Sequence, residues 1–153
     1  MQVRDFMRQD VVTTKSNTSL PQLWKLLSRK HIHSISVVDG ASKLLGIIVK
    51  EDFLKKLFPD YSEVLPELGL HADDEELDIE WEKLKHLTAA SVMKTQVLFT
   101  RPDTNVVRAL SRMIVQRVRQ LPVLDDNDQL IGVISKGDIF DRLFMRRKNK
   151  QRI

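Results

Sequence analysis

The 153-residue chain has no cysteine, and this absence excludes disulfides, thiolate metal sites and cysteine nucleophiles together. The five glycines form no dinucleotide-binding, P-loop or nucleophile-elbow motif, so the sequence gives no support for an enzyme. No apolar run approaches the roughly 20 residues of a membrane span. The first ten residues include charged side chains and no apolar core, so we expect no signal peptide and a cytoplasmic location.

What the chain does contain is enough apolar sequence for a core and a strongly uneven charge. Hydrophobic residues make up 42% and charged residues 30%, which is typical of a compact globular protein. The net charge of +4 divides into −6 over residues 55–88 and +10 over the rest. We expect the basic tail at residues 145–153 to be solvated. Binding of this tail to nucleic acid or an anionic membrane is a less favoured alternative, because the tail lacks interleaved aromatic residues.

An internal repeat organises the sequence. A shift of 86 positions aligns residues 7–58 with residues 93–144 without a gap, and 13 of the 52 aligned positions are identical. Such a match over a whole unit indicates two copies of one supersecondary unit. The predicted domains are repeat 1 at residues 1–58, an acidic, partly helical linker at 59–88, repeat 2 at 89–144 and the basic tail at 145–153.

Both copies predict the same order of elements, β-α-β-β-α. A short apolar strand ends at Thr14 or Thr100, and a helix follows, with Thr18 or Thr104 as the expected N-cap and Pro21 at the third helical position. The helices show a 3.6-residue apolar period. The predicted apolar positions are Leu20, Trp24 and Leu27 in copy one and Val106, Leu110, Met113 and Ile114 in copy two. The predicted hairpin strands are 35–38 with 44–49 and 121–124 with 130–135.

A second amphipathic helix closes each copy. Its apolar residues are Phe53, Leu54, Leu57 and Phe58 in copy one and Ile139, Phe140, Leu143 and Phe144 in copy two. In the linker, a narrow apolar stripe on an acidic helix is formed by Leu77, Trp81, Leu84 and Leu87 and supported by the pairs Glu80–Lys83 and Glu82–Lys85. This stripe packs either on the chain's own repeats or on a dimer or partner surface.

Ser135 and Asp138 lie where a strand ends and a helix begins. Ser135 is a natural N-cap, and an acid three residues later fits a capping-box role, so a purely structural interpretation is available. Copy one argues against capping alone, because Val49 cannot cap and yet Asp52 persists. A helix N-terminus beside a hydroxyl also favours phosphate, and a carboxylate can accept from both hydroxyls of a ribose.

The element order, the Leu121–Asp125 run and the Gly132–Asp138 sequence GVISKGD resemble a tandem pair of CBS domains, a Bateman module. The resemblance implies an α/β (α+β) fold of two pseudo-symmetric repeats packed through their sheets, with the acidic helical insert between them. It also implies an adenosyl ligand in the cleft between the copies. Asp138 would then hold ribose, and Ser135 would contact phosphate or ribose. The full set of implied ligand-binding residues is Thr100, Arg119, Gln120, Pro122, Ser135 and Asp138.

Copy one departs from the family pattern at Val49, which replaces the hydroxyl residue, and at Ser36, which replaces the proline. A weaker second site is therefore predicted at Thr14, His33, Lys50 and Asp52. His31 and His33 invite a metal interpretation, but no third ligand is close in sequence and their counterparts are Arg117 and Arg119. Anion contact or plain surface fits them better, so no metal is predicted.

The leading hypothesis is a regulatory, non-enzymatic sensor of AMP, ADP, ATP or S-adenosylmethionine. We expect it to form a homodimer and to signal to an unidentified protein target in trans by conformational or oligomeric change. The alternative is a dimeric interaction scaffold with degenerate ligand sites, whose partner is recruited by the acidic insert or the basic tail.

Overall fold

The computed structural model describes residues 1–29, 32–57 and 82–150. The predictions for His31, Phe58 and most of the acidic linker, including Leu77 and Trp81, lie outside these residues. Glu82 and Lys85 are described, and the Lys85 Nζ lies 2.6 Å from the Glu82 Oε2 as expected for an i, i+3 pair. The hydrogen bond from Lys85 lowers the pKa of the Glu82 carboxyl.

The chain divides into two compact units, and each unit contains the first residues of the other sequence copy. We call these residues, 1–12 of copy one and 89–96 of copy two, the exchanged leading segments. Unit 1 comprises Met1–Val12, Gly40–Leu44 and the described residues from Val97 onward, and unit 2 comprises the described parts of Thr13–Asp39 and Leu45–Gln96. The first twelve residues of the chain thus belong with the elements of copy two. The predicted boundaries of the sequence repeats remain predictions, and the compact units are assembled differently.

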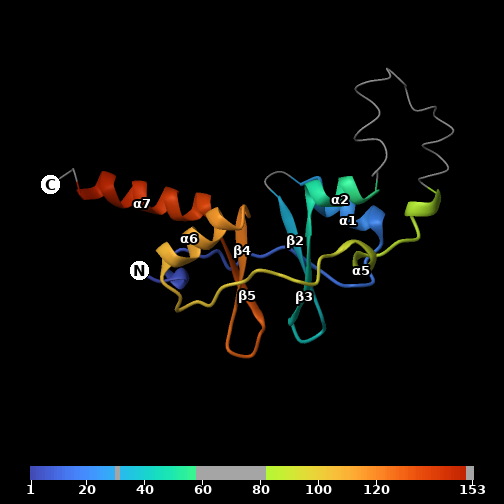
Figure 1. Ribbon diagram of the computed structural model, residues 1–153, viewed down its shortest axis with the longest axis horizontal. Coiled ribbons are helices and arrows are strands. Elements are labelled where there is room, and N and C mark those ends of the chain that lie inside the picture. The colour runs from blue at the N-terminus through green and yellow to red at the C-terminus, as the bar shows by residue number, and fades with distance from the viewer. Residues whose placement is uncertain (30–31, 58–81, 151–153) are drawn as a thin grey trace, which may run out of the picture. The chain divides into compact units, whose positions relative to one another are not determined.

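Unit 1 is built around a two-stranded antiparallel hairpin (Figure 1). Its register runs from Gln120 opposite Ser135 to Leu124 opposite Leu130. One further chain segment pairs with each outer edge of the hairpin, Thr100 in parallel with Val123 and Arg8 antiparallel to Val133. The elements are a 3-10 turn η1 (Val3–Asp5), helix α6 (Val106–Val115), strands β4 (Gln120–Leu124) and β5 (Leu130–Ser135), and helix α7 (Lys136–Lys150).

Unit 2 repeats this arrangement with copy-one elements. Its sheet has the order β1-β2-β3, with β1 parallel to β2, and Lys94 forms an antiparallel bridge to Ile47 of β3. The elements are β1 (Thr13–Thr14), α1 (Leu20–Leu27), β2 (Ser34–Val38), β3 (Leu44–Val49), α2 (Lys50–Leu57) and α5 (Ala89–Val92). The α/β class and both hairpins are confirmed, with strand ends within one residue. In copy two the first predicted strand is the single bridge at Thr100.

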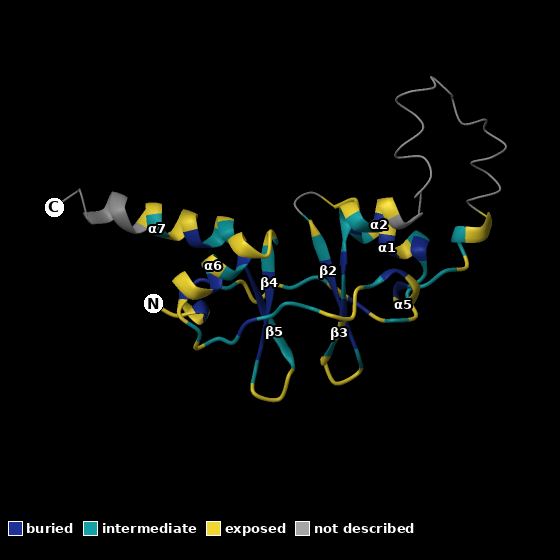
Figure 2. Ribbon diagram, viewed as in Figure 1, coloured by how far each residue is buried: buried dark blue, intermediate teal, exposed yellow. Residues whose placement is uncertain are grey.

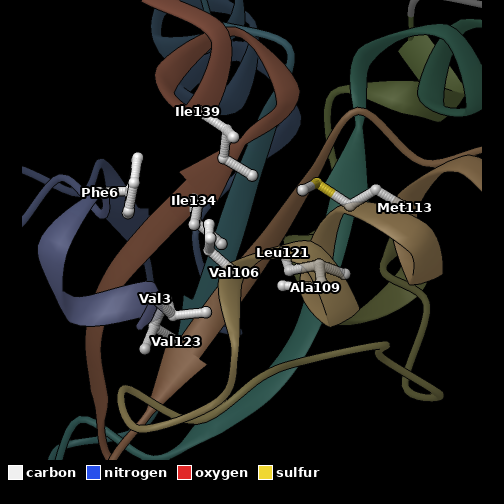
Figure 3. Close-up of a cluster of buried hydrophobic side chains, with 9 residues drawn as sticks. All are labelled: Val3, Phe6, Val106, Ala109, Met113, Leu121, Val123, Ile134 and Ile139. Atoms are coloured by element: carbon white, nitrogen blue, oxygen red, sulfur yellow. The ribbon is translucent and has the colours of Figure 1, made fainter. Parts of the chain in front are cut away.

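Each unit has its own hydrophobic core. In unit 1, Val3 and Phe6 are 0% and 3% exposed and pack with residues of copy two, where Figure 3 shows Val3 beside Val123. Exposed residues, yellow in Figure 2, gather at the hairpin turns. The unit 1 core is Val3, Phe6, Val106, Ala109, Met113, Leu121, Val123, Ile134 and Ile139. The unit 2 core is Leu20, Leu23, Leu27, Ile35, Val37, Ile48, Phe53, Ala89 and Val92.

The helix N-caps lie one residue later than predicted. Ser19 caps α1 in a capping box with Gln22, and the Asn105 side chain accepts from the Val107 N–H at 2.9 Å. The predictions of Thr18 and Thr104 were therefore wrong. Because α1 begins at Leu20, Pro21 occupies the second helical position rather than the third. The Thr18 hydroxyl instead accepts a 2.7 Å hydrogen bond from the Thr14 hydroxyl.

The predicted apolar faces of α1 and α6 are confirmed at Leu20, Leu27, Val106 and Met113, which are buried, but not at every position. Trp24 and Ile114 are 43% and 58% exposed, whereas Leu23 and Ala109 are fully buried. The buried positions still follow a helical spacing of three and four residues. Only the predictions for Trp24 and Ile114 were wrong, because a helical spacing also admits Leu23 and Ala109, which the packing of each helix buries instead. In the part of the chain that the structure describes, no helix is both long and apolar enough to cross a membrane.

Candidate ligand site in unit 1

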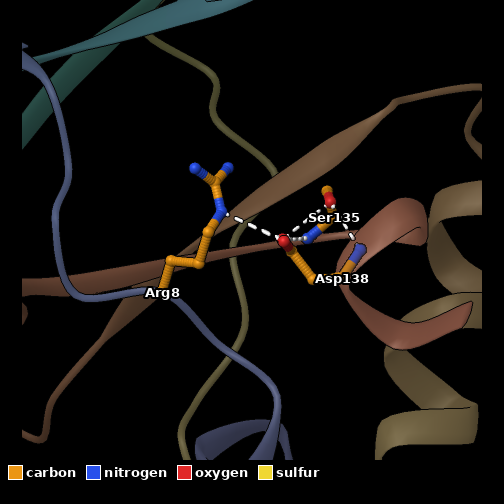
Figure 4. A network of polar contacts seen from close by, with 3 residues as sticks. All are labelled: Arg8, Ser135 and Asp138. Atoms are coloured by element: carbon orange, nitrogen blue, oxygen red, sulfur yellow. Dashed lines mark hydrogen bonds and ion pairs between the residues drawn. The ribbon is translucent and has the colours of Figure 1, made fainter. Parts of the chain in front are cut away.

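Asp138 stands at the junction of β5 and α7 and is held there by Ser135. The Ser135 Oγ accepts from the Asp138 N–H at 3.0 Å, and the Asp138 Oδ2 accepts from the Ser135 N–H at 2.9 Å and from its hydroxyl at 2.6 Å (Figure 4). These reciprocal bonds confirm the predicted capping box. They fix the rotamer of the carboxylate before any ligand arrives.

Arg8 is the second partner of Asp138, and the sequence analysis missed it. Its Nε lies 3.1 Å from the Asp138 Oδ1 and 3.3 Å from the Oδ2. Two backbone hydrogen bonds hold Arg8 beside β5, with its N–H donating to Val133 at 2.8 Å and its carbonyl accepting from Val133 at 2.9 Å. A signal was present in the sequence, because the alignment of the copies matches Arg8 with another cation, Lys94.

Gly132 lets the Arg8 segment approach β5 this closely. A Cβ at Gly132 would lie 2.8 Å from the Arg8 carbonyl oxygen and 3.0 Å from the Met7 Sδ. In unit 2, a Cβ at Gly46 would lie 2.8 Å from the Lys94 carbonyl oxygen. Both distances are too short for any side chain, so the recurring glycine of the repeat has a packing role.

Thr100 is buried on the outer edge of β4. It is 2% exposed, its N–H donates to the Pro122 carbonyl at 2.9 Å, and its carbonyl accepts from Leu124 at 3.0 Å. Among the described residues, its Oγ1 has no hydrogen-bond partner. A buried hydroxyl without a partner is costly, so this one calls for a specific explanation.

The beginning of β4 lies beside the beginning of α7. Gln120 is paired with Ser135, and the Lys136 N–H donates to the Arg119 carbonyl at 3.2 Å. The structure thus brings Arg119 and Gln120 close to the Ser135–Asp138 capping box. The buried Pro122 lies further along β4, opposite Val133 of β5, and Thr100 pairs with the other edge of β4, away from β5. The predicted residues therefore form two groups along the β4–β5 hairpin. Arg119, Gln120, Ser135 and Asp138 lie at the β5–α7 junction, and Thr100 and Pro122 lie further along β4.

The residues of the predicted weaker site in unit 2 have a similar framework with different polar groups. The Lys94 Nζ lies 2.6 Å from the Asp52 Oδ2, which matches the Arg8–Asp138 pair. Val49 provides no hydroxyl at the start of α2. The Lys50 N–H donates to the His33 carbonyl at 3.0 Å, and the Lys50 Nζ lies 5.8 Å from the centroid of the Trp24 ring.

The presence of an aspartate at the same position of both copies, Asp52 and Asp138, thus has a structural explanation besides helix capping. In each unit the carboxylate pairs with a cation from the exchanged leading segment, through Arg8 or Lys94. The pairs are partly exposed and contribute little to stability individually. Within the described residues, no three His, Cys, Asp or Glu side chains are grouped to hold a metal ion.

Comparisons with known proteins agree with this architecture. The profile of the CBS domain matches residues 3–59 and again residues 89–144. A CBS domain-containing protein of Dictyostelium discoideum is 33% identical, over 92% of this chain and 90% of its own length. The crystal structure of CBSX2 of Arabidopsis thaliana in complex with AMP has a TM-score of 0.73 and 26% identity, covering 95% of this chain and 98% of that one.

A further crystal structure contains other adenosyl compounds. The CBS domain pair of protein MJ0100, in complex with 5′-methylthioadenosine and S-adenosylmethionine, has a TM-score of 0.68 and 25% identity, covering 94% of this chain and 99% of that one. The two profile matches span most of the sequence and coincide with the two copies of the repeat. The chain belongs to the CBS domain family.

Proposed function

We propose that this chain is a regulatory module that binds an adenine nucleotide or another adenosyl compound and passes its ligand state to a protein partner. The observation that carries the proposal is the Asp138 carboxylate, fixed by Ser135 at the β5–α7 junction. The complexes of CBSX2 with AMP and of MJ0100 with S-adenosylmethionine support the ligand class. No catalytic role is proposed for any residue.

The chemistry of the site suits a nucleoside. Asp138 offers carboxylate oxygens to the hydroxyls of a ribose, and Ser135 adds a hydroxyl beside them. Arg119 and Gln120 border this region through their backbone pairing with Lys136 and Ser135. Along β4, the unpartnered Oγ1 of Thr100 is a candidate contact for the base.

Unit 1 is the better of the two candidate sites. In unit 2, the Thr14 hydroxyl donates to Thr18, whereas its counterpart Thr100 has no partner among the described residues. Lys50 lies over Trp24, and Val49 has no hydroxyl to offer a ligand. A second site using Thr14, His33, Lys50 and Asp52 is therefore expected to bind more weakly.

We also propose that a second copy of this chain covers an apolar face on α6 and α7 of unit 1. Four large side chains of these helices, Val107, Ile114, Phe140 and Phe144, are between 46% and 64% exposed. Large apolar side chains exposed together on neighbouring elements are typical of protein interfaces. Sedimentation of the wild type should show a dimer, and Ile114→Asp should shift it to a monomer. A monomeric wild type at micromolar concentration would contradict this assignment.

The test of the function is thermal unfolding of ligand-stripped protein with AMP, ADP, ATP, GTP, S-adenosylmethionine and NAD. A ligand at about 100 times its Kd adds about 2.7 kcal/mol of stability, which raises the midpoint by roughly 5–11 °C for a chain of this size. Asp138→Asn keeps an acceptor for Ser135 and removes the charge, so it should abolish the shift. The matched variant Asp52→Asn in unit 2 should retain it.

The competing function is a dimeric scaffold with degenerate ligand sites. The observation in its favour is that both aspartates already have cationic partners, Arg8 and Lys94. It predicts that no adenosyl compound moves the unfolding midpoint while the protein remains a dimer. A selective shift that is lost in Asp138→Asn would exclude it.

A further inference from the structure

Arg8 contacts Asp138 in a way that leaves part of its guanidinium available. Only the Nε reaches the carboxylate, and the two terminal nitrogens point away from Asp138 (Figure 4). The Arg8 side chain is 48% exposed, whereas that of Asp138 is 19% exposed. A guanidinium has five N–H donors in a fixed plane, so anchoring through Nε still presents four of them to a neighbouring anion.

The Asp138 carboxylate is already well supplied with donors. Its Oδ2 accepts both Ser135 bonds, and the Arg8 Nε is shared between its two oxygens. A carboxylate has about four acceptor positions, so two ribose hydroxyls compete with Arg8 for the remaining ones. The Ser135 bonds are local and belong to the helix cap, so Arg8 is the group that a ribose displaces or shares.

The outcome of this competition depends on what the ribose carries at its 5′ position. A 5′-phosphate gives the displaced guanidinium a new anion close by, with charge-assisted hydrogen bonds that replace those to Asp138. Adenosine and 5′-methylthioadenosine are neutral there, and S-adenosylmethionine carries a sulfonium cation. With these ligands, Arg8 loses part of its contact with Asp138 and gains no anion at the 5′ position, because the carboxylate of S-adenosylmethionine is several bonds further along the methionine chain.

From this geometry we propose that Arg8 is a specificity-determining residue, which makes the unit 1 site select adenosine 5′-phosphates over neutral or cationic adenosyl compounds. The inference rests on the proposed function, because it requires a ribose at Asp138. The selectivity comes from the exchanged leading segment of copy one. Backbone pairing with Val133 holds this segment in place, so the cation is positioned before the ligand binds.

Unit 2 provides a natural control. Lys94 occupies the matching position, but its one nitrogen lies directly on Asp52 at 2.6 Å and its side chain is 60% exposed. An ammonium is a point charge without the planar fork of arginine. Because Lys94 also pairs with Asp52 and not with Asp138, Lys94→Ala should leave the preference of the unit 1 site for AMP over adenosine unchanged.

The experiment is isothermal titration of the full chain with AMP and with adenosine, for the wild type, Arg8→Ala, Arg8→Lys and Lys94→Ala. The wild type should bind AMP more tightly than adenosine. Arg8→Ala should weaken AMP by roughly ten- to hundredfold, the size of a lost charge-assisted hydrogen bond, and leave adenosine equal or tighter. The AMP affinity of Arg8→Lys should lie between those of the wild type and Arg8→Ala, because lysine keeps the positive charge but lacks the planar, forked guanidinium.

The results separate this inference from the proposed function. If the wild type binds neither AMP nor adenosine, the role of Arg8 is wrong. The proposed function is wrong as well if ADP, ATP and S-adenosylmethionine also leave the unfolding midpoint unchanged. A second outcome overturns only the role of Arg8. In it, the wild type binds AMP and Asp138→Asn abolishes this binding, but Arg8→Ala changes the affinities for AMP and adenosine by the same factor or leaves both unchanged. Thermal unfolding of Arg8→Ala in the absence of ligand checks folding, and Arg8→Lys tests the same residue with its charge retained.

Discussion

Replacement of Gly132 by alanine tests the contact that holds the exchanged segment against β5. The added Cβ would lie 2.8 Å from the Arg8 carbonyl oxygen, a backbone atom that cannot turn aside as a side chain can. The segment must move outward, which strains the two hydrogen bonds between Arg8 and Val133. Val3 and Phe6 lie on the same segment and are buried in the unit 1 core, so their packing is disturbed as well.

Overpacking of this kind costs about 1–3 kcal/mol. For a chain of about 150 residues, each kcal/mol moves the thermal midpoint by about 2–4 °C, so Gly132→Ala should lower it by roughly 2–12 °C. Gly46→Ala should act similarly in unit 2, where the Cβ would lie 2.8 Å from the Lys94 carbonyl oxygen.

Gly40→Ala is the matched control. A Cβ at Gly40 would have no atom within 4 Å, so alanine should be tolerated there or stabilise slightly. The assay is thermal unfolding followed by circular dichroism, with urea unfolding as a check on the slope. Equal midpoints for Gly132→Ala and Gly40→Ala would refute the close approach of the segment to β5.

Three further predictions follow from the caps and the ion pairs. Asn105→Ala should lower the free energy of unfolding by about 0.5–2 kcal/mol and Thr104→Ala by less, as measured by urea denaturation, because the Asn105 side chain caps α6; the reverse order would restore the cap to Thr104. Ser135→Ala should cost about 1 kcal/mol in the same assay through loss of the α7 cap, and an unchanged stability would show that the cap is dispensable. Lys94→Ala should cost less than about 1 kcal/mol and the loss should shrink further in high salt, because its pair with Asp52 is half-exposed; a large, salt-independent loss would contradict this.

Features that depend on neighbours in sequence were predicted well. The alternation of strands and turns fixed the hairpins to within one residue. The three-residue spacing of Ser135 and Asp138 predicted their capping box, because a cap closes hydrogen bonds within one turn of helix. The internal repeat predicted that the two halves share one element order, and the structure confirms this order except for the short first strand of copy two.

Finer choices among adjacent residues were not decided by sequence. Thr104 and Asn105 are both good N-caps, and only the backbone path into α6 selects Asn105. Trp24 and Leu23 both fit a helical apolar period. The orientation of α1 against its sheet decides which of them is buried, and it buries the leucine.

The sequence by itself determined the repeat, the strands and the position of the Asp138 carboxylate at the start of a helix. Only the tertiary structure decided that Arg8, 130 positions away, pairs with this carboxylate. Periodicity and capping act within a few residues, whereas the exchange of leading segments depends on which sheet edge each segment covers. That choice is made by the packing of Val3 and Phe6 and by the space above Gly132, neither of which is a local property of the chain.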